Sequence, residues 1–315
     1  MTMATQQKNL YFASLGCSKN LVDSQVMLGI LSKEGLKVVH EPEMADVIIV
    51  NTCSFIEAAK EESISTILEL ANYKEEGVCK ALVMSGCMAQ RYSGELEKEL
   101  PEVDLFIGTG EYHRVAKLLK ALEEGALEKK SFVEIPKFIH TEFDPRVNTS
   151  PFYMAYLKVS EGCNRNCTFC IIPTLRGKLR SRSVASLVEE AKNLVSTGVK
   201  ELNLISQDLS DYGSDLDETN TLLSLFQGLS QVEGASWIRP FYLYPDDLSE
   251  ELMDFMSKNE KICRYLDMPI QHFSDSVLKR MNRKVTGDLI IQKVKRLREK
   301  IPAIKIRTSV IVGFP

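Results

Sequence analysis

The N-terminal part of the chain alternates short apolar runs with stretches of helical period. Three apolar runs predict buried strands over residues 10–15, 47–50 and 81–84. Between these strands, residues 23–35 carry one apolar stripe and residues 54–71 open with a capping-box pattern, so both stretches predict helices. Strands that alternate with helices predict a parallel α/β sheet.

The same alternation returns in the second half of the chain. Apolar runs there predict five strands, over residues 153–160, 201–207, 238–244, 265–270 and 304–312. Residues 184–197 fit a helix with Ser183 as its cap and Gly198 at its exit. Five strand–helix repeats of this kind predict an open, partial (β/α) barrel.

A proline-bearing stretch without a sustained period separates the two halves. We therefore expect an N-terminal domain over residues 1–135, a linker over residues 136–151 and a second domain over residues 152–315. The chain stops at VIVGFP, directly after an apolar strand with no helix to cover it. This ending predicts that the second domain is truncated at its C-terminal end.

Each predicted strand of the first domain is followed by a cysteine, namely Cys17, Cys53 and Cys87. The carboxyl ends of parallel strands lie along one edge of a sheet, so we expect these three thiols to converge where ligands bind. Such thiols can bind zinc, form a reactive pair or hold an iron–sulfur cluster. Cys79 and Cys263 precede their strands, which places them at the opposite edges and predicts a structural role for both.

A second set of cysteines lies within one short segment of the other domain. Cys163, Cys167 and Cys170 follow the spacing C-x-x-x-C-x-x-C, which a single loop can wrap around one inorganic cluster. A structural zinc site normally closes with a fourth Cys or His, and a disulfide would leave one cysteine over. Three thiolates instead favour a four-iron cluster with one iron open to a small ligand. A second cluster on the N-terminal cysteines is then the simplest interpretation of that trio.

This spacing, with Phe169 just before the third cysteine, resembles the radical S-adenosylmethionine (SAM) enzymes. The resemblance implies that the amino and carboxylate groups of SAM chelate the open iron. An electron from the cluster then splits SAM into methionine and a 5'-deoxyadenosyl radical.

Period-two counting gathers polar residues on one face of the second domain's strands, among them Lys158, Asn203, Gln207 and Asp267. Barrel interiors that serve stability alone are filled with branched apolar side chains. A polar interior suits a large charged ligand, so we expect Gln207 and Asp267 near SAM. The alternative is that the faces are inverted and these residues meet solvent or helices.

Several stretches resemble the radical SAM methylthiotransferases, namely SLGCSKNLVDSQ, NTCSFIEAAKEE and SGCMAQR. Together with SEGCNRNCTFCIIPTLRG, ISQDLSDYG and YLDMPIQH, they look most like the branch that modifies an aspartate of small-subunit ribosomal protein S12. GCMAQR is closer to the wording of the branch that modifies an adenosine of tRNA, which stays the alternative substrate. The resemblance covers essentially the whole chain.

The resemblance implies two 4Fe-4S clusters, one on Cys17, Cys53 and Cys87 and one on the loop trio, with SAM as co-substrate. One SAM methylates sulfide held at the N-terminal cluster, and a second supplies the radical that activates a C–H bond. It also implies an electron donor such as flavodoxin or ferredoxin, a sulfur donor and a further C-terminal β-domain. An electron carrier with two clusters is the alternative of another class.

Composition limits the partners and the compartment. The net charge of −4 and a pI near 5.8 argue against binding nucleic acid by bulk electrostatics. There is no long apolar run and no signal-peptide core at the N-terminus, so we expect a cytoplasmic protein without a membrane partner. In that reducing compartment the eight cysteines are better interpreted as cofactor ligands than as disulfides.

Overall fold

The computed structural model describes residues 7–245 and 248–315. The chain forms two compact units: the first holds Met1–Val147 with Thr174–Arg176, and the second holds Asn148–Pro173 with Gly177–Pro315. The predicted linker, residues 136–151, contains the first division between them, while the predicted domain limits themselves stay a prediction. Residues 1–6, part of the segment judged to lack a signal-peptide core, lie outside the described residues.

The first unit contains one six-stranded parallel sheet of order β2-β1-β3-β4-β5-β6. The predicted strands are confirmed as β1, β3 and β4, which are neighbours in this order. The bounds are β1 Asn9–Ser14, β2 Lys37–Val38, β3 Val47–Thr52, β4 Ala81–Gly86, β5 Leu105–Ile107 and β6 Ser131–Phe132.

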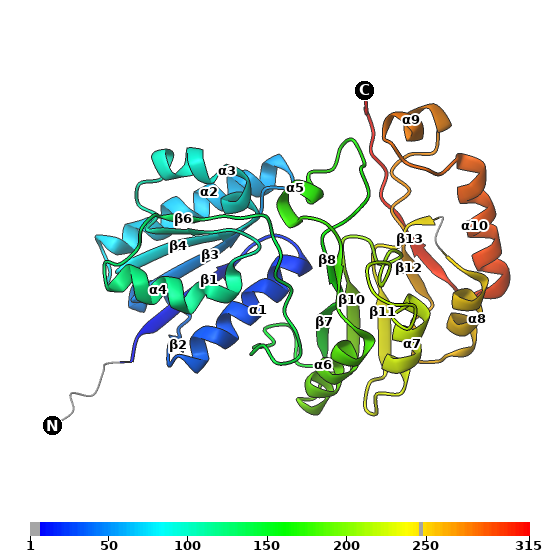
Figure 1. Ribbon diagram of the computed structural model, residues 1–315, viewed down its shortest axis with the longest axis horizontal. Helices are drawn as coiled ribbons and strands as arrows, with labels where there is room; N and C mark the ends of the chain where they lie inside the picture. The colour runs from blue at the N-terminus through cyan, green and yellow to red at the C-terminus, as the bar shows by residue number, and fades with distance from the viewer. Residues whose placement is uncertain (1–6, 246–247) are drawn as a thin grey trace. The chain divides into compact units, whose positions relative to one another are not determined.

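Helices cover both faces of this sheet (Figure 1). Helices α1 (Ser18–Lys33) and α4 (Val115–Glu123) pack on one face, and α2 (Glu57–Ala71) and α3 (Cys87–Glu99) pack on the other. Alternate residues of β3 enter the two cores, which explains why this strand is apolar throughout. Short 3₁₀ turns lie at Pro42–Met44, Asn72–Lys74 and Tyr112–Arg114.

The predicted capping box of Ser54 and Glu57 is wrong. Helix α2 has Ile56 as its N-cap, and no side chain caps it. Ser54 is fully buried, and its hydroxyl donates to the carbonyl oxygen of Cys87 at 3.1 Å. The hydroxyl therefore joins two strand ends instead of starting the helix.

The second unit is built on five parallel strands in two ladders. Strands β11 (Trp237–Pro240), β10 (Glu201–Ile205) and β7 (Met154–Lys158) form one ladder, and β12 (Tyr265–Asp267) pairs with β13 (Lys305–Arg307). A parallel bridge between Ile238 and Ile262 joins the two. A small antiparallel pair, β8 (Ser160–Glu161) and β9 (Arg180–Ser181), precedes α6 (Val184–Ser196) in the chain.

The five predicted strands are present but end earlier than predicted. Tyr242 and Gln271 adopt left-handed φ angles of 62° and 68°, which break the extended conformation after β11 and β12. The helices are α5 Ile172–Arg176, α6 Val184–Ser196, α7 Leu222–Ser230, α8 Glu250–Lys258, α9 Asp275–Arg280 and α10 Gly287–Lys300. The Ser183 cap of α6 is confirmed, since its hydroxyl accepts from the Ser186 amide at 3.2 Å.

The strand register settles which face is polar. Leu157, Leu204 and other apolar strand residues belong to the core that α6, α7, α8 and α10 cover. Their neighbours Lys158, Asn203 and Asp267 point to the opposite face and are buried there. The predicted face is therefore confirmed for these three residues. No helix of the described residues is long and apolar enough to span a membrane.

Candidate functional site

The N-terminal cysteines follow three adjacent strands. Cys17 is the N-cap of α1 after β1, Cys53 follows β3, and Cys87 begins α3 after β4. Because β1, β3 and β4 are parallel neighbours, their carboxyl ends bring the three thiols to one edge of the sheet. Cys53 and Cys87 are buried, while Cys17 is exposed. The edge thus offers one open thiol and two enclosed ones.

Two glycines make the turns at this edge possible. Gly16 and Gly86 have φ angles of 89° and 94°, which other residues rarely adopt. A Cβ at Gly16 would lie 2.8 Å from the Cβ of Cys53, and a Cβ at Gly86 would lie 2.2 Å from the Asn51 side-chain oxygen. The chain therefore needs glycine before Cys17 and Cys87.

A buried polar network lies behind the thiols. The side chain of Asn20 donates to the Thr52 carbonyl at 2.7 Å, and the side chain of Asn51 donates to the Asn20 carbonyl and the Ser24 hydroxyl at 2.8 Å each. Ser63 accepts from the Cys53 amide at 3.1 Å. These bonds fix the backbone on which the cysteines stand.

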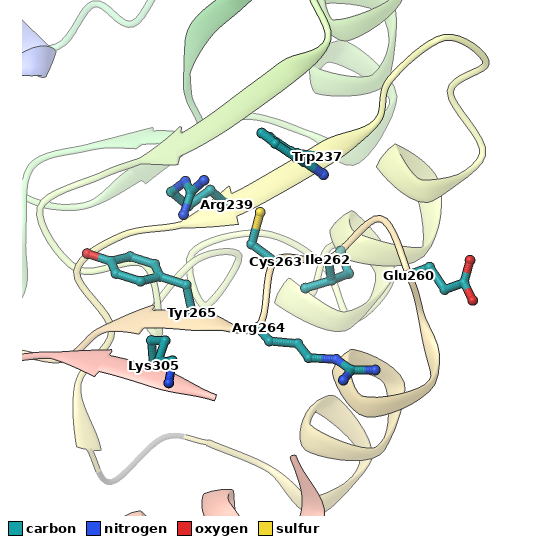
Figure 2. A pocket seen from close by; sticks show the side chains of 8 residues that line it. All are labelled: Trp237, Arg239, Glu260, Ile262, Cys263, Arg264, Tyr265 and Lys305. Carbon is teal, nitrogen blue, oxygen red and sulfur yellow. The ribbon is translucent and has the colours of Figure 1, made fainter. Parts of the chain in front are cut away.

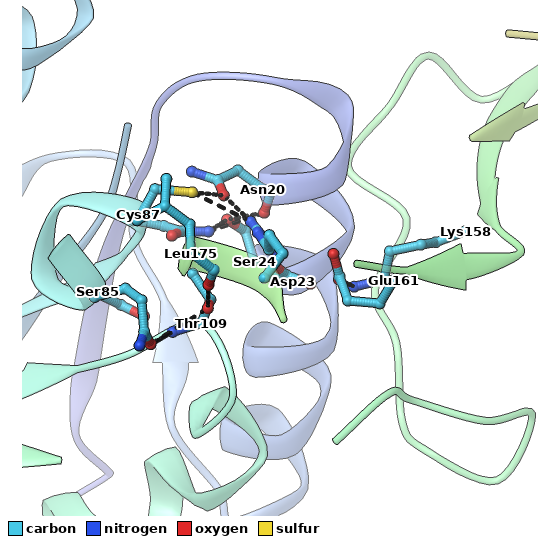
Figure 3. Close-up of polar contacts among 12 residues, drawn as sticks. Asn20, Asp23, Ser24, Ser85, Cys87, Thr109, Lys158, Glu161 and Leu175 are labelled. Carbon is cyan, nitrogen blue, oxygen red and sulfur yellow. Dashed lines mark hydrogen bonds and ion pairs between the residues drawn. The ribbon is translucent and has the colours of Figure 1, made fainter. Parts of the chain in front are cut away.

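Arg176 reaches this network and is 1% exposed. Its guanidinium donates to Asp23 at 2.6 Å, to the Asn20 side-chain oxygen, and to the Cys87 sulfur at 3.5 Å. Figure 3 shows Asn20, Asp23 and Cys87 gathered at one end of α1. Burial raises the pKa of the Cys87 thiol to about 11, against the opposing charge of Arg176.

Sequence reasoning did not identify Asn20, Asp23 or Arg176 as site residues. The available signal was an arginine that ends a short apolar stretch, IIPTLR, directly after the loop cysteines. An arginine in an apolar stretch indicates a buried ion pair, but the sequence pattern does not identify Asp23 as the acidic partner.

The second trio lies in the loop between β8 and α5, and all three thiols are half-buried. The amide of Cys170 donates to the Cys167 carbonyl at 3.0 Å, and the Arg165 amide donates to the Cys163 sulfur at 3.3 Å. The pKa of Cys163 is raised to about 11, mainly by burial, with smaller contributions in the same direction from Asp208 and the other two loop cysteines and against the hydrogen bond from the Arg165 amide. One backbone amide of the loop therefore already contacts a loop sulfur.

Phe169 stands beside this loop trio. Its ring meets the ring of Phe314 edge to face, with centroids 6.3 Å apart.

The two remaining cysteines lie away from both trios. Cys79 is buried at the amino end of β4, and its thiol lies 3.5 Å from the Ala81 carbonyl oxygen. Cys263 lines a pocket of about 460 Å³ at the amino end of β12, beside Trp237 (Figure 2). These placements agree with the edges predicted for both thiols.

Each trio supplies three thiols, the number that leaves one iron of a four-iron cluster open. Among the described residues, no three Cys, His, Asp or Glu side chains surround a position for one metal ion.

The polar face of the second unit fits a ligand with charges and hydroxyls. Glu161 and Lys158 form a buried ion pair of 2.7 Å (Figure 3). Gln207 donates to the other Glu161 oxygen at 2.6 Å. Asp267 is fully buried and accepts from Arg307 at 2.6 Å.

Three buried polar atoms on or beside this face have no hydrogen-bond partner among the described residues: the hydroxyl of Ser160, the side-chain oxygen of Gln207 and one oxygen of Asp267. Buried polar atoms are normally satisfied, so these three are available to a ligand. Gln207 and Asp267 as SAM-binding residues stay a prediction, and the sequence did not single out Glu161, which contacts Gln207.

Two family models match the chain. Residues 9–108 match the Uncharacterized protein family UPF0004, and residues 157–315 match the Radical SAM superfamily. Among solved structures, the fold resembles the cobalamin-dependent SAM radical enzyme OxsB, with a TM-score of 0.68, 13% identity and coverage of 97% of this chain and 49% of that one. It also resembles the radical SAM methyltransferase TsrM from Kitasatospora setae, with a TM-score of 0.65, 12% identity and coverage of 98% and 70%. These similarities confirm the predicted fold class.

Closer relatives share half of the sequence. The Trichlorobacter lovleyi protein named ribosomal protein uS12 methylthiotransferase RimO is 51% identical over 315 residues, which are 100% of this chain and 70% of that protein. The protein of the same name from Clostridioides difficile is 50% identical over 302 residues, which are 96% of this chain and 68% of that protein. The predicted resemblance is thus confirmed: the chain belongs to the RimO family of ribosomal protein uS12 methylthiotransferases, and its second half is a radical SAM domain.

Proposed function

We propose that the protein transfers a methylthio group to the β-carbon of an aspartate of ribosomal protein uS12, using two 4Fe-4S clusters and SAM. The choice of uS12 as substrate rests on one observation: about half of the residues are identical, over nearly the whole chain, to those of proteins named uS12 methylthiotransferase. The two separate cysteine trios support the number of clusters. An adenosine of tRNA stays the second candidate, because GCMAQR at Cys87 resembles that branch.

Bound to Cys163, Cys167 and Cys170, a cluster would supply the electron that splits SAM, and a cluster on Cys17, Cys53 and Cys87 would hold the sulfur to be methylated and transferred. An unactivated C–H bond has no acidic proton to remove. The protein's own side chains therefore need only to bind, orient and exclude water, and no general acid–base pair is required.

The polar face of the second unit is the part of the chain suited to hold SAM. We propose that Gln207 and Asp267 bind its polar groups through their unpartnered oxygens. Glu161, held by Lys158 and Gln207, orients this layer. Phe169 would cover the ligand from the cluster loop, since its ring stands next to the third cysteine.

The chemistry also requires partners. Splitting SAM consumes an electron, so an electron donor of the flavodoxin or ferredoxin type must dock, and a sulfur donor must reload the N-terminal site. Both partners are implied by the reaction that the resemblance predicts.

The test is an assay of the purified protein with reconstituted clusters, SAM and reductant against uS12 and against tRNA. We expect 5'-deoxyadenosine and a uS12 peptide in which methylthio replaces one hydrogen. Modified tRNA with unmodified uS12 would move the protein to the second candidate. Reversible redox without SAM cleavage would indicate an electron carrier instead.

A further inference from the structure

Arg176 is a fully buried cation in direct contact with a predicted cluster ligand. Its Nη2 donates to the Cys87 sulfur at 3.5 Å and to the Asn20 side-chain oxygen, and its Nη1 donates to Asp23 at 2.6 Å. Cys87 also lies 3.5 Å from that Asn20 oxygen. One guanidinium therefore connects the third N-terminal cysteine with two side chains of α1.

Stability alone does not require this arrangement. Removing two charges from water costs several kcal/mol per ion, so a buried pair contributes little compared with apolar residues of similar volume. The Arg176–Asp23 pair is almost completely buried, with side-chain exposures of 2% and 4%. A cation placed there gains more if a second anion forms next to it, and thiolates on a cluster are such anions.

In this contact a cationic N–H donor faces a sulfur that would carry negative charge as a cluster ligand. Hydrogen bonds to the sulfurs and nearby charge are among the factors that set the reduction potential of an iron–sulfur cluster. A cationic donor at a thiolate stabilises the more negative, reduced state and raises the potential. An anion near the cluster has the opposite effect, and Asp23 is that anion.

We propose that Arg176 is a positioning residue of the N-terminal cluster, which donates an N–H···S hydrogen bond to Cys87 and raises the reduction potential of that cluster. Asp23 orients the guanidinium and limits this rise. The inference rests on the proposed function, because it requires a cluster on Cys17, Cys53 and Cys87.

The chain supplies a matched control. Arg182 is another buried arginine, 3% exposed, and it pairs with Glu190 and donates to the Ser186 hydroxyl at 3.0 Å. The guanidinium of Arg182 donates to Ser186, Glu190 and the Lys158 carbonyl, and none of these partners is a cysteine. Changes at Arg182 therefore reproduce the loss of a buried ion pair without touching a predicted cluster ligand.

The experiment uses protein in which Cys163, Cys167 and Cys170 are replaced by Ala, so that all remaining cluster iron belongs to the N-terminal site. In this background, the midpoint potential is measured by redox titration with electron paramagnetic resonance for Asp23→Asn, for Asp23→Asn with Arg176→Met, and for Arg182→Met with Glu190→Gln. The double variant at Asp23 and Arg176 leaves no buried unpaired charge. The midpoint potential can therefore be measured in this variant even if the single variant folds poorly. Thermal unfolding of each variant records any structural damage separately.

We expect Asp23→Asn to raise the potential and the double variant at Asp23 and Arg176 to lower it below that of the parent, while the control leaves it unchanged. Shifts of the same sign, or no shift in the double variant, would overturn the inference and leave Arg176 a structural residue. If the parent with the three loop alanines binds no iron, the proposed N-terminal cluster fails instead, so the two failures are distinguishable.

Discussion

The two cysteine trios solve the same problem in opposite ways. The N-terminal trio is assembled by the sheet, with one thiol after each of three neighbouring parallel strands. The loop trio comes from a single segment whose backbone amides already contact its own sulfur and carbonyl. The first site therefore depends on the fold of its whole unit, and the second depends mainly on local chain geometry.

The surroundings differ in the same way. Behind Cys87 lies a buried network of Asn20, Asp23 and Arg176, whereas the loop thiols are half-buried and have no comparable cation bonded to a sulfur among the described hydrogen bonds. We interpret the first site as tuned by fixed protein charges. The second, by contrast, is left open for SAM to approach.

The largest effect is expected from the loop trio. Replacing Cys163, Cys167 and Cys170 by Ala should abolish SAM cleavage, because the cluster on these cysteines would supply the electron that splits SAM. Production of 5'-deoxyadenosine under reducing conditions is the measurement. Continued cleavage at the parent rate would show that the radical is generated elsewhere.

The N-terminal trio should separate cleavage from transfer. We expect Cys87→Ala to lose methylthio transfer to uS12 while 5'-deoxyadenosine production continues, since the radical site is left intact. Mass spectrometry of uS12 and chromatography of the nucleoside products give the two rates. Loss of both activities in a folded variant would mean that the trios do not act separately.

A smaller effect is expected on the polar face. Asp267→Ala should weaken SAM binding without loss of iron, because the carboxylate has one oxygen free for a ligand. A hydrogen bond involving a charged group contributes about 1.5–3 kcal/mol, which corresponds to a dissociation constant about 10 to 150 times larger. Calorimetry with SAM on the cluster-loaded variant measures this. Unchanged affinity would contradict the role given to Asp267.

The smallest effect is expected at the two remaining cysteines. Cys79→Ser and Cys263→Ser should keep both clusters and SAM cleavage, because these thiols lie at the amino ends of their strands. Cys79→Ser should still lower the free energy of unfolding by about 1–3 kcal/mol, since a hydroxyl enters an apolar core. Denaturant unfolding and iron content test both statements, and a missing cluster in either variant would refute the assignment.

The sequence predicted the part of the site that follows from the positions of the strands. Parallel strands fix which side of a sheet their carboxyl ends occupy, so the convergence of Cys17, Cys53 and Cys87 followed from strand order alone. The contact of Arg176 with Asn20 joins residues 156 positions apart, and no local pattern specifies it. Ser54 shows the same limit, since its capping pattern is overridden by a tertiary bond to Cys87.

If the protein holds two clusters on two separate cysteine trios, counting the clusters tests this most directly. Iron content and Mössbauer spectra would be compared for the reconstituted parent, for the Cys163, Cys167 and Cys170 alanine variant, and for the matching variant of Cys17, Cys53 and Cys87. We predict that each variant keeps one 4Fe-4S cluster and roughly half of the iron. If either variant, still folded, lost all of its iron or none of it, the two-site account would be contradicted.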